Sequence, residues 1–239
     1  MIELNSVSVK KNQKTILDSV SFSTAPGECL GIIGSNGAGK STLLNTILGY
    51  ELISNGRIQV NNLELNSISL EKRAKYFAYV STNTHCPFDF SVKEIVQMGR
   101  YPYSQTNDCS ETILNEVLTQ TNLSKLSHKS IQTLSTGEWQ RVQLARAFVQ
   151  NTNYIILDEP LAHLDLYYQE EISSILKAKQ KDDKIGILMT SHQLSHIENI
   201  CSKVLMLKLG KVVDIVHSSE LNADLVRKVF SLPETWGSI

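Results

Sequence analysis

The sequence has little cysteine and no excess charge of either sign. Its four cysteines, Cys29, Cys86, Cys109 and Cys201, include no C-x-x-C pair. This spacing argues against a zinc ribbon and against a disulfide-stapled secreted fold, so a reducing compartment is expected. Lys and Arg total 23 against 24 for Asp and Glu, which gives a net charge of −1. That balance supplies no overall attraction for polyanions, and we expect no nucleic-acid partner.

Long apolar runs, internal repeats and a leader are also lacking. No stretch reaches the roughly 18 uncharged apolar residues of a membrane span, and the first five residues lack the basic and apolar regions of a signal peptide. The 239 residues, 41% of them hydrophobic, are enough to bury a sizeable core and exclude a disordered or fibrous chain. We therefore expect a cytoplasmic protein, soluble by itself, that forms a single domain over residues 1–239.

Short apolar segments alternate with helical periodicity, which predicts an α/β fold with a parallel sheet. Strands are expected near 7–9 and 20–22 and at 29–33, 154–157 and 185–189. Helices are expected at 41–49, 169–181 and 223–230, with a hairpin from 204–209 to 212–216.

Residues 84–150 have a different pattern. Helical periodicity covers 92–98 and 111–120, with polar linkers between them. We interpret 84–150 as an inserted helical subdomain, and 1–83 together with 151–239 as a nucleotide-binding core.

A glycine-rich segment follows the apolar run at 29–33. Residues 34–41 match G-x-x-x-x-G-K-[ST] between a predicted strand and a predicted helix. Glycines allow backbone N–H groups to surround phosphate oxygens, Lys40 can reach the outer phosphates, and the Ser41 hydroxyl can bind Mg²⁺. A plain glycine-rich turn is the alternative. The candidate ligands of a nucleotide are Gly34, Ser35, Asn36, Gly37, Ala38, Gly39, Lys40, Ser41 and Thr42.

Two carboxylates follow the apolar segment 154–157. Asp158 is placed to bind Mg²⁺ next to a P-loop. Glu159 comes after it at the exposed strand end, where it can orient or deprotonate the water that attacks the γ-phosphate. The alternative is an exposed Asp-Glu-Pro turn that ends a strand.

Residues 134–141 read Leu-Ser-Thr-Gly-Glu-Trp-Gln-Arg. Ser135 with Glu138 three residues later is the pattern of a capping box, which starts a helix. Ser135 and Gly137 can also form an anion site at that helix start. Together with the P-loop, the segment resembles the L-S-G-G-[QE] signature of the ABC ATPases, with Thr136 in place of the first glycine.

That resemblance covers nearly the whole chain, and it implies an α/β P-loop NTPase fold of the ABC type, with an antiparallel β subdomain and an inserted helical subdomain. Two domains of that family sandwich two ATP molecules, each held by one P-loop and the opposite signature, so Ser135, Gly137 and Glu138 are implied as ATP ligands. Asp165 is similar to the aspartate that crosses the dimer interface, and His192 to the switch histidine at the γ-phosphate. The pair His192 and His196 could instead suggest zinc, but no third ligand stands out.

The sequence departs from the family at two places. Thr82 stands where the family has a glutamine that senses Mg²⁺ and water, and a hydroxyl reaches less far than a carboxamide. No aromatic residue precedes Phe22 to stack on adenine, so Val9 or Lys11 is expected there.

Phe90 to Val96, followed by Gly99-Arg100-Tyr101-Pro102-Tyr103, resembles the ATPases of iron-siderophore, haem and cobalamin importers. From the residues alone, the second segment predicts a helix that ends at Gly99 and a proline turn. The resemblance implies an ATP-hydrolysing homodimer with Mg²⁺, bound to an integral membrane permease on the inner face of the cell membrane, and a solute-binding protein. The alternative is a soluble, non-transport ABC ATPase that acts on nucleic acid or protein complexes.

We predict weak discrimination between ATP and GTP. A missing base-stacking partner removes roughly 1 to 3 kcal/mol of base-specific binding, by analogy with nucleic-acid stacking. Steady-state hydrolysis by the purified protein should give similar KM values for the two nucleotides. A large preference for ATP would contradict this prediction.

Overall fold

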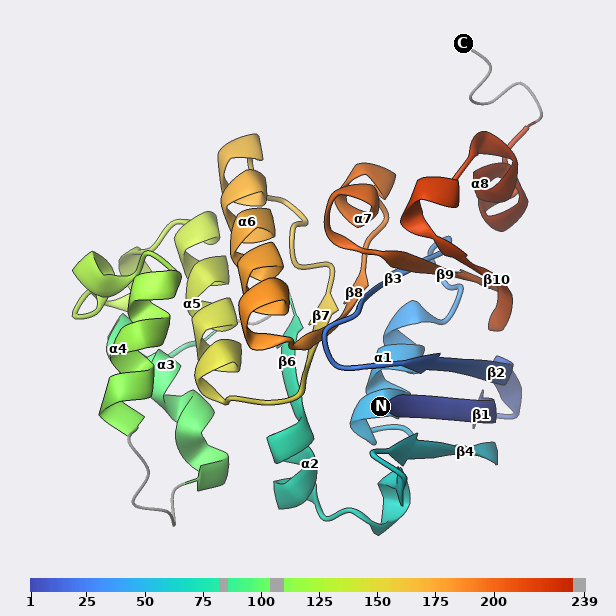
Figure 1. Cartoon of the computed structure of the whole chain (residues 1–239), viewed down its shortest axis with the longest axis horizontal. Coiled ribbons are helices and arrows are strands. Elements are labelled where there is room, and N and C mark those ends of the chain that lie inside the picture. Colours follow the sequence, from blue (N-terminus) through green and yellow to red (C-terminus); the bar gives the residue numbers. More distant parts are fainter. Residues whose placement is uncertain (82–85, 104–109, 234–239) are drawn as a thin grey trace.

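Two β-sheets organise the chain (Figure 1). The computed structural model describes residues 1–81, 86–103 and 110–233. Within these residues, the larger sheet has the strand order β10-β9-β3-β8-β7-β6. Its strands are β3 (Cys29–Ile33), β6 (Phe77–Ser81), β7 (Tyr154–Asp158), β8 (Gly186–Thr190), β9 (Lys203–Lys208) and β10 (Lys211–His217).

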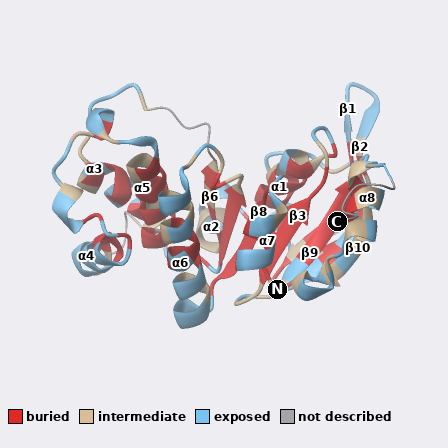
Figure 2. Ribbon diagram, turned by 90° about the horizontal axis from the view of Figure 1, so that it is seen from above, coloured by how far each residue is buried: buried red, intermediate tan, exposed pale blue. Residues whose placement is uncertain are grey.

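The strands β3, β6, β7, β8 and β9 are parallel, which confirms the predicted parallel sheet. Strand β7 shows why its sequence is a continuous apolar run. Successive side chains of a strand point to opposite faces, so Ile155 and Leu157 lie in one core and Tyr154 and Ile156 in the other. All four are fully buried, and Figure 2 shows the labelled central strands β3, β8 and β9 largely in the colour of buried residues.

The smaller sheet is antiparallel, as predicted, and has the order β2-β1-β4-β5. Helix α1 packs between the two sheets, because Leu43, Leu44 and Ile47 share a core with Ile2 and Leu4. The elements are β1 (Ile2–Lys11), β2 (Lys14–Thr24), β4 (Asn55–Val60), β5 (Leu63–Glu64) and α1 (Lys40–Leu48).

Where the structure describes it, the segment between β6 and β7 forms helical elements, apart from one isolated β-bridge between Ser91 and Ser130. Leu144 and Phe148 of its long helix α5 share one core with Val80 and Ile155 of the central sheet. Besides α1, the α-helices of the described residues are α2 (Leu70–Tyr76), α3 (Val92–Gln97), α4 (Ser110–Gln120), α5 (Thr136–Val149), α6 (Leu166–Asp183), α7 (Leu194–Ile200) and α8 (Ala223–Phe230). The 3-10 helices are η1 (Leu65–Ser67), η2 (Met98–Tyr103), η3 (Ser124–Leu126), η4 (Ile131–Thr133) and η5 (Ser218–Glu220). Of these described helices, none is both long and apolar enough to cross a membrane.

The predicted strands, helices and late hairpin are confirmed, with small differences at their ends. The sequence analysis did not predict β4, β5, α2, β6 and α7. The prediction that a helix ends at Gly99 is wrong, because α3 ends at Gln97 and the 3-10 helix η2 continues through Pro102. Gly99 is needed there for close approach, since a Cβ at this position would lie 2.1 Å from the carbonyl oxygen of Arg146 on α5.

Candidate functional site

The glycine-rich segment forms a loop between β3 and α1, as its sequence predicts. Gly39 is the N-cap of α1 with φ of 106°, and Gly37 has φ of 78°, a region that favours glycine. Gly34 is restricted by space instead, since a Cβ there would lie 2.2 Å from the carbonyl oxygen of Leu207. The loop therefore needs glycine at each of these three positions.

Lys40 is a buried cation at the start of α1. Its Nζ donates hydrogen bonds to the loop's own carbonyls, at 2.7 Å to Gly34 and 3.3 Å to Ser35. Burial lowers the pKa of Lys40, and the nearby charges of Glu159 and Asp158 oppose that shift. A negatively charged phosphate group bound in the loop would stabilise the charged form of Lys40, which burial destabilises.

Three polar side chains lie in a row where parallel strands end. Asp158 of β7 is paired in register with Ser81 of β6 on one side and with Thr190 of β8 on the other. The Thr190 hydroxyl donates to Asp158 Oδ1 at 2.6 Å and accepts the backbone N–H of Glu159 at 3.0 Å. One buried threonine thus fixes both predicted acidic residues.

Glu159 takes a left-handed backbone conformation, with φ of 57°. That conformation costs a residue with a side chain roughly 1 to 2 kcal/mol, and the bond from its N–H to Thr190 helps to hold it. The turn brings the Glu159 carboxylate into hydrogen-bond contact with Nδ1 of His192, which follows β8. The two predicted catalytic residues therefore lie together.

His196 is hydrogen-bonded to a different residue from the one that His192 contacts. It is buried, its Nε2 contacts Gln169 Oε1 at 3.2 Å, and burial lowers its pKa. Within the described residues, no group of three or more His, Cys, Asp or Glu side chains could hold a metal ion.

A cleft of about 530 Å³ joins the loop to the carboxylates. The Ser41 hydroxyl and the Asp158 carboxylate both face it, and hard oxygen donors of this kind suit Mg²⁺. The cleft is lined by Lys14, Ile16, Asn36, Gly37, Gly39, Lys40, Ser41, Thr42, Ser81, Asp158 and Glu159. The remaining predicted loop residues, Gly34, Ser35 and Ala38, are not in that lining.

Neither Val9 nor Lys11 is among the residues that line this cleft. Val9 is buried in the core between the sheets, and Lys11 forms an ion pair with Glu51. Lys14 and Ile16 of β2 line the cleft instead.

The predicted capping box at the signature is confirmed. Ser135 is the N-cap of α5, and its Oγ accepts the N–H of Glu138 at 3.2 Å. The Glu138 carboxylate accepts the N–H of Ser135 at 2.8 Å, and this bond lowers the Glu138 pKa. Asp165 has a similar role at α6, where its Oδ1 accepts the N–H of Tyr168 at 3.0 Å.

The signature does not meet the P-loop within one chain. Ser135, Gly137, Glu138 and Asp165 are absent from the described lining of the cleft. Ser135 is exposed at the start of its helix. The structure therefore brings together the loop, both carboxylates and His192, and leaves the signature apart from them.

The fold and the loop define a P-loop nucleotide-binding protein. A comparison with family models matches residues 17–162 to the ABC transporter family. The chain belongs to the ABC transporter family, as an ATP-binding and ATP-hydrolysing subunit.

Relatives of known name agree with this membership. The hemin import ATP-binding protein HmuV of Escherichia coli O157:H7 is 32% identical over 219 residues, which cover 89% of this chain and 85% of the relative. HmuV of Bordetella avium (strain 197N) is 32% identical over 240 residues, which cover 97% and 92%.

Solved structures show the same fold. A chain of the structure described as an inward-facing conformation of a metal-chelate type ABC transporter is 26% identical, with a TM-score of 0.84 over 97% of this chain and 89% of the other. The cbiO1 protein of Clostridium perfringens, part of the ABC transporter complex cbiONQ, is also 26% identical, with a TM-score of 0.84 over 95% and 93%.

Sequence reasoning missed Ser81, Lys14, Ile16 and the role of Thr190. Thr190 could have been found, because it is the last residue of the apolar run that precedes His192. The departure at Thr82 lies outside the described residues.

We predict that Thr190→Val damages both stability and turnover. Valine has a similar shape but leaves the Glu159 N–H and the Asp158 carboxylate without their buried partner. The free energy of unfolding, measured by urea denaturation, should fall by about 1 to 3 kcal/mol, and kcat should fall more than KM changes. Thr190→Ser is the matched control, since it keeps the hydroxyl; equal loss in both variants would show that the methyl group, and not the hydrogen bonds, is what matters.

Proposed function

We propose that two copies of this chain hold two ATP molecules between them and hydrolyse them to drive a membrane importer. One observation carries this proposal. No signature residue is among the residues that line the P-loop cleft, whereas Ser135 is exposed at the N-terminus of α5, where the helix end favours an anion. Each signature then completes the cleft of the other copy, with Ser135, Gly137 and Glu138 at the phosphates and Asp165 at the interface.

The residues of the P-loop and those at the carboxyl ends of β7 and β8 would carry out the hydrolysis of ATP. The loop from Gly34 to Thr42 and the Lys40 cation bind the phosphates, and Ser41 and Asp158 would hold Mg²⁺, which neutralises phosphate charge when bound. Glu159 accepts a proton from the attacking water and so increases its nucleophilicity. His192, hydrogen-bonded to that carboxylate, orients it toward the γ-phosphate.

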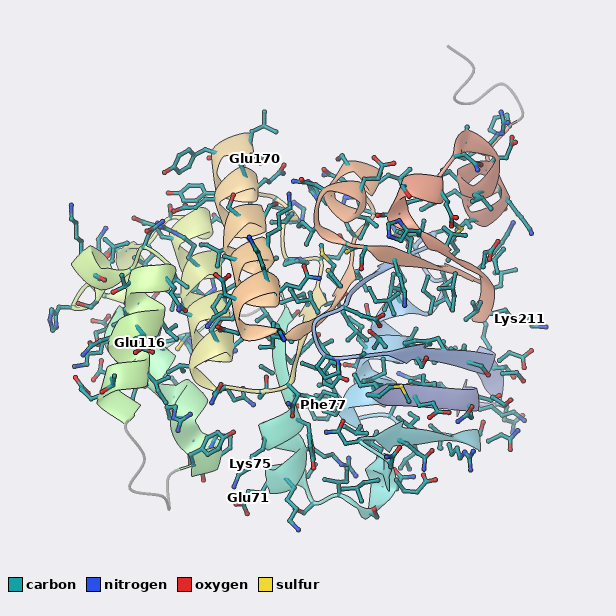
Figure 3. The ribbon with its side chains drawn as sticks, viewed as in Figure 1. Glu71, Lys75, Phe77, Glu116, Glu170 and Lys211 are labelled. Carbon is teal, nitrogen blue, oxygen red and sulfur yellow. The ribbon has the colours of Figure 1, made fainter. Side chains whose placement is uncertain are left out.

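A second groove, of about 520 Å³, suits the permease. It lies between α2 and β6 on one side and η2 and α5 on the other; Phe77 and Lys75 mark its first side (Figure 3). Its rim exposes Tyr50, Leu70, Met98 and Tyr101. The groove is lined by Leu48, Tyr50, Leu70, Arg73, Ala74, Phe77, Tyr79, Met98, Gly99, Tyr101, Pro102, Arg146, Ala147 and Gln150.

The charges of this groove indicate the kind of segment that fills it. Arg73 and Arg146 are present, and no carboxylate is found among those lining residues. Burial lowers the pKa of Arg146 because it removes water from the guanidinium. A hydrogen-bond acceptor that approaches the guanidinium would stabilise its charged form. A cytoplasmic segment of the permease that carries an apolar face and an acidic group or a helix C-terminus fits these features.

The cargo class rests on resemblance and on the groove together. The relatives import hemin by name, and the segment Gly99 to Tyr103, similar to that of iron-siderophore, haem and cobalamin importers, forms part of the groove wall. We therefore propose import of haem or a related metal chelate, with a solute-binding protein outside the membrane. This places the subunit at the cytoplasmic face, held there by the permease.

Residues 84–150 would act as the helical signature subdomain, and 1–83 with 151–239 as the nucleotide-binding core. The alternative of a soluble ATPase that acts on nucleic acid is not favoured, since the named relatives are import proteins and the net charge is −1.

Glu159→Gln should trap a dimer that contains ATP. The amide keeps the shape of the side chain but accepts no proton, so kcat should fall at least about 100-fold while nucleotide binding persists. Light scattering after size-exclusion chromatography with Mg²⁺ and ATP should give twice the mass of the chain. Lys40→Ala in the same background should stay monomeric, because it removes the phosphate contact. A Glu159→Gln chain that remains monomeric at saturating nucleotide would overturn the sandwich.

Tyr101→Ala should weaken binding to the permease. The Tyr101 side chain is 81% exposed on the groove rim, and loss of an aromatic anchor costs about 1 to 3 kcal/mol, or tenfold and more in affinity. The measurement is binding of the purified subunit to its permease in detergent. Ile215→Ala, an exposed residue of β10 at the opposite edge of the sheet, is the matched control. Equal affinity of both variants would exclude the groove as the permease site.

A further inference from the structure

Tyr168 lies at the junction between the signature and the start of α6. Its ring packs on Gly137, because a Cβ at Gly137 would lie 2.2 Å from Tyr168 Cγ. The Arg141 guanidinium lies over the same ring, 5.7 Å from its centroid. The ring therefore fits against the first two turns of α5.

The Tyr168 hydroxyl lies 3.3 Å from Ser135 Oγ. Ser135 Oγ already accepts the N–H of Glu138 at 3.2 Å. A serine hydroxyl has two lone pairs and one proton. When Tyr168 donates to the second lone pair, both acceptor sites of Ser135 are filled, and its hydroxyl acts only as a donor, to the neighbouring Glu138 carboxylate or to an incoming phosphate oxygen.

We propose that Tyr168 is a positioning residue for the ATP held by the second copy of the chain. By filling the acceptor sites of Ser135, it makes the Ser135 hydroxyl a prepared hydrogen-bond donor to the γ-phosphate. Such preparation lowers the entropy lost when the two copies and their nucleotides come together. The proposal rests on the ATP sandwich proposed above.

The surroundings of Tyr168 hold it in place. Its N–H donates to Asp165, and Arg141 Nη1 contacts Glu171 Oε1 at 3.0 Å, with the two side chains only 9% and 13% exposed. Asn122 Nδ2 donates to the same Glu171 oxygen at 2.9 Å. The start of α6 and the start of α5 are thus fixed to each other, and Tyr168 links Asp165 to Ser135.

The test measures how much ATP the Glu159→Gln chain needs to dimerise. Tyr168→Phe keeps the ring on Gly137 and removes only the hydroxyl, so the half-maximal ATP concentration should rise roughly three- to tenfold with an unchanged Tm. Tyr167→Phe is the matched control. Its side chain is 71% exposed, and its hydroxyl has no hydrogen bond among the described residues.

A double-mutant cycle separates this role from simple packing. If Tyr168 acts through Ser135, then Tyr168→Phe should change nothing further in a chain that already carries Ser135→Ala. The same ATP requirement for Tyr168→Phe and the parent chain, or an undiminished effect of Tyr168→Phe in the Ser135→Ala chain, overturns the proposal and leaves the sandwich intact. A Glu159→Gln parent that fails to dimerise removes both proposals together.

Discussion

Strand β7 is hydrogen-bonded on both edges, to β6 and to β8, and all three strands run in the same direction. Because parallel strands place their carboxyl ends at one edge of the sheet, Ser81, Asp158 and Thr190 become neighbours although they lie far apart in the chain. The apolar residues before them are buried on both faces, so a shift of register would expose them to water. Burial of the core and positioning of the carboxylates therefore depend on the same pairing.

The nucleotide cleft and the second groove share strand β6. Phe77 and Tyr79 of this five-residue strand line the groove, and Ser81 at its end lines the cleft. The helical segment and the sheet also share one continuous core. Because close-packed cores transmit displacements with little compliance, a segment seated in the groove has a short, rigid connection to the nucleotide.

A single chain brings together the P-loop and the carboxylates, and its signature segment lies outside that cleft. The loop, Asp158, Glu159 and His192 lie together, whereas Ser135 is at the surface, already prepared by its capping contacts with Glu138. A helix cap and an anion site use the same end of a helix, so the observed capping box is compatible with the function proposed for the signature. The exposed Ser135 is available for the contact with a second copy that the proposed sandwich requires.

Local residue order determined the P-loop, the capping box, most strands and helices, and the presence of carboxylates after β7, because each depends on neighbours within a few positions. It did not predict β6 or α2, whose short segments carry weak periodicity and are stabilised by packing. It did not predict that Lys14 and Ile16 of β2 line the cleft, because the strand that borders the P-loop is decided by the pairing of the two sheets and not by local sequence. Only the tertiary structure shows Thr190 between Asp158 and Glu159, and Tyr168 against Gly137. These contacts join segments distant in sequence, and the strand register and helix packing that bring them together leave no local pattern.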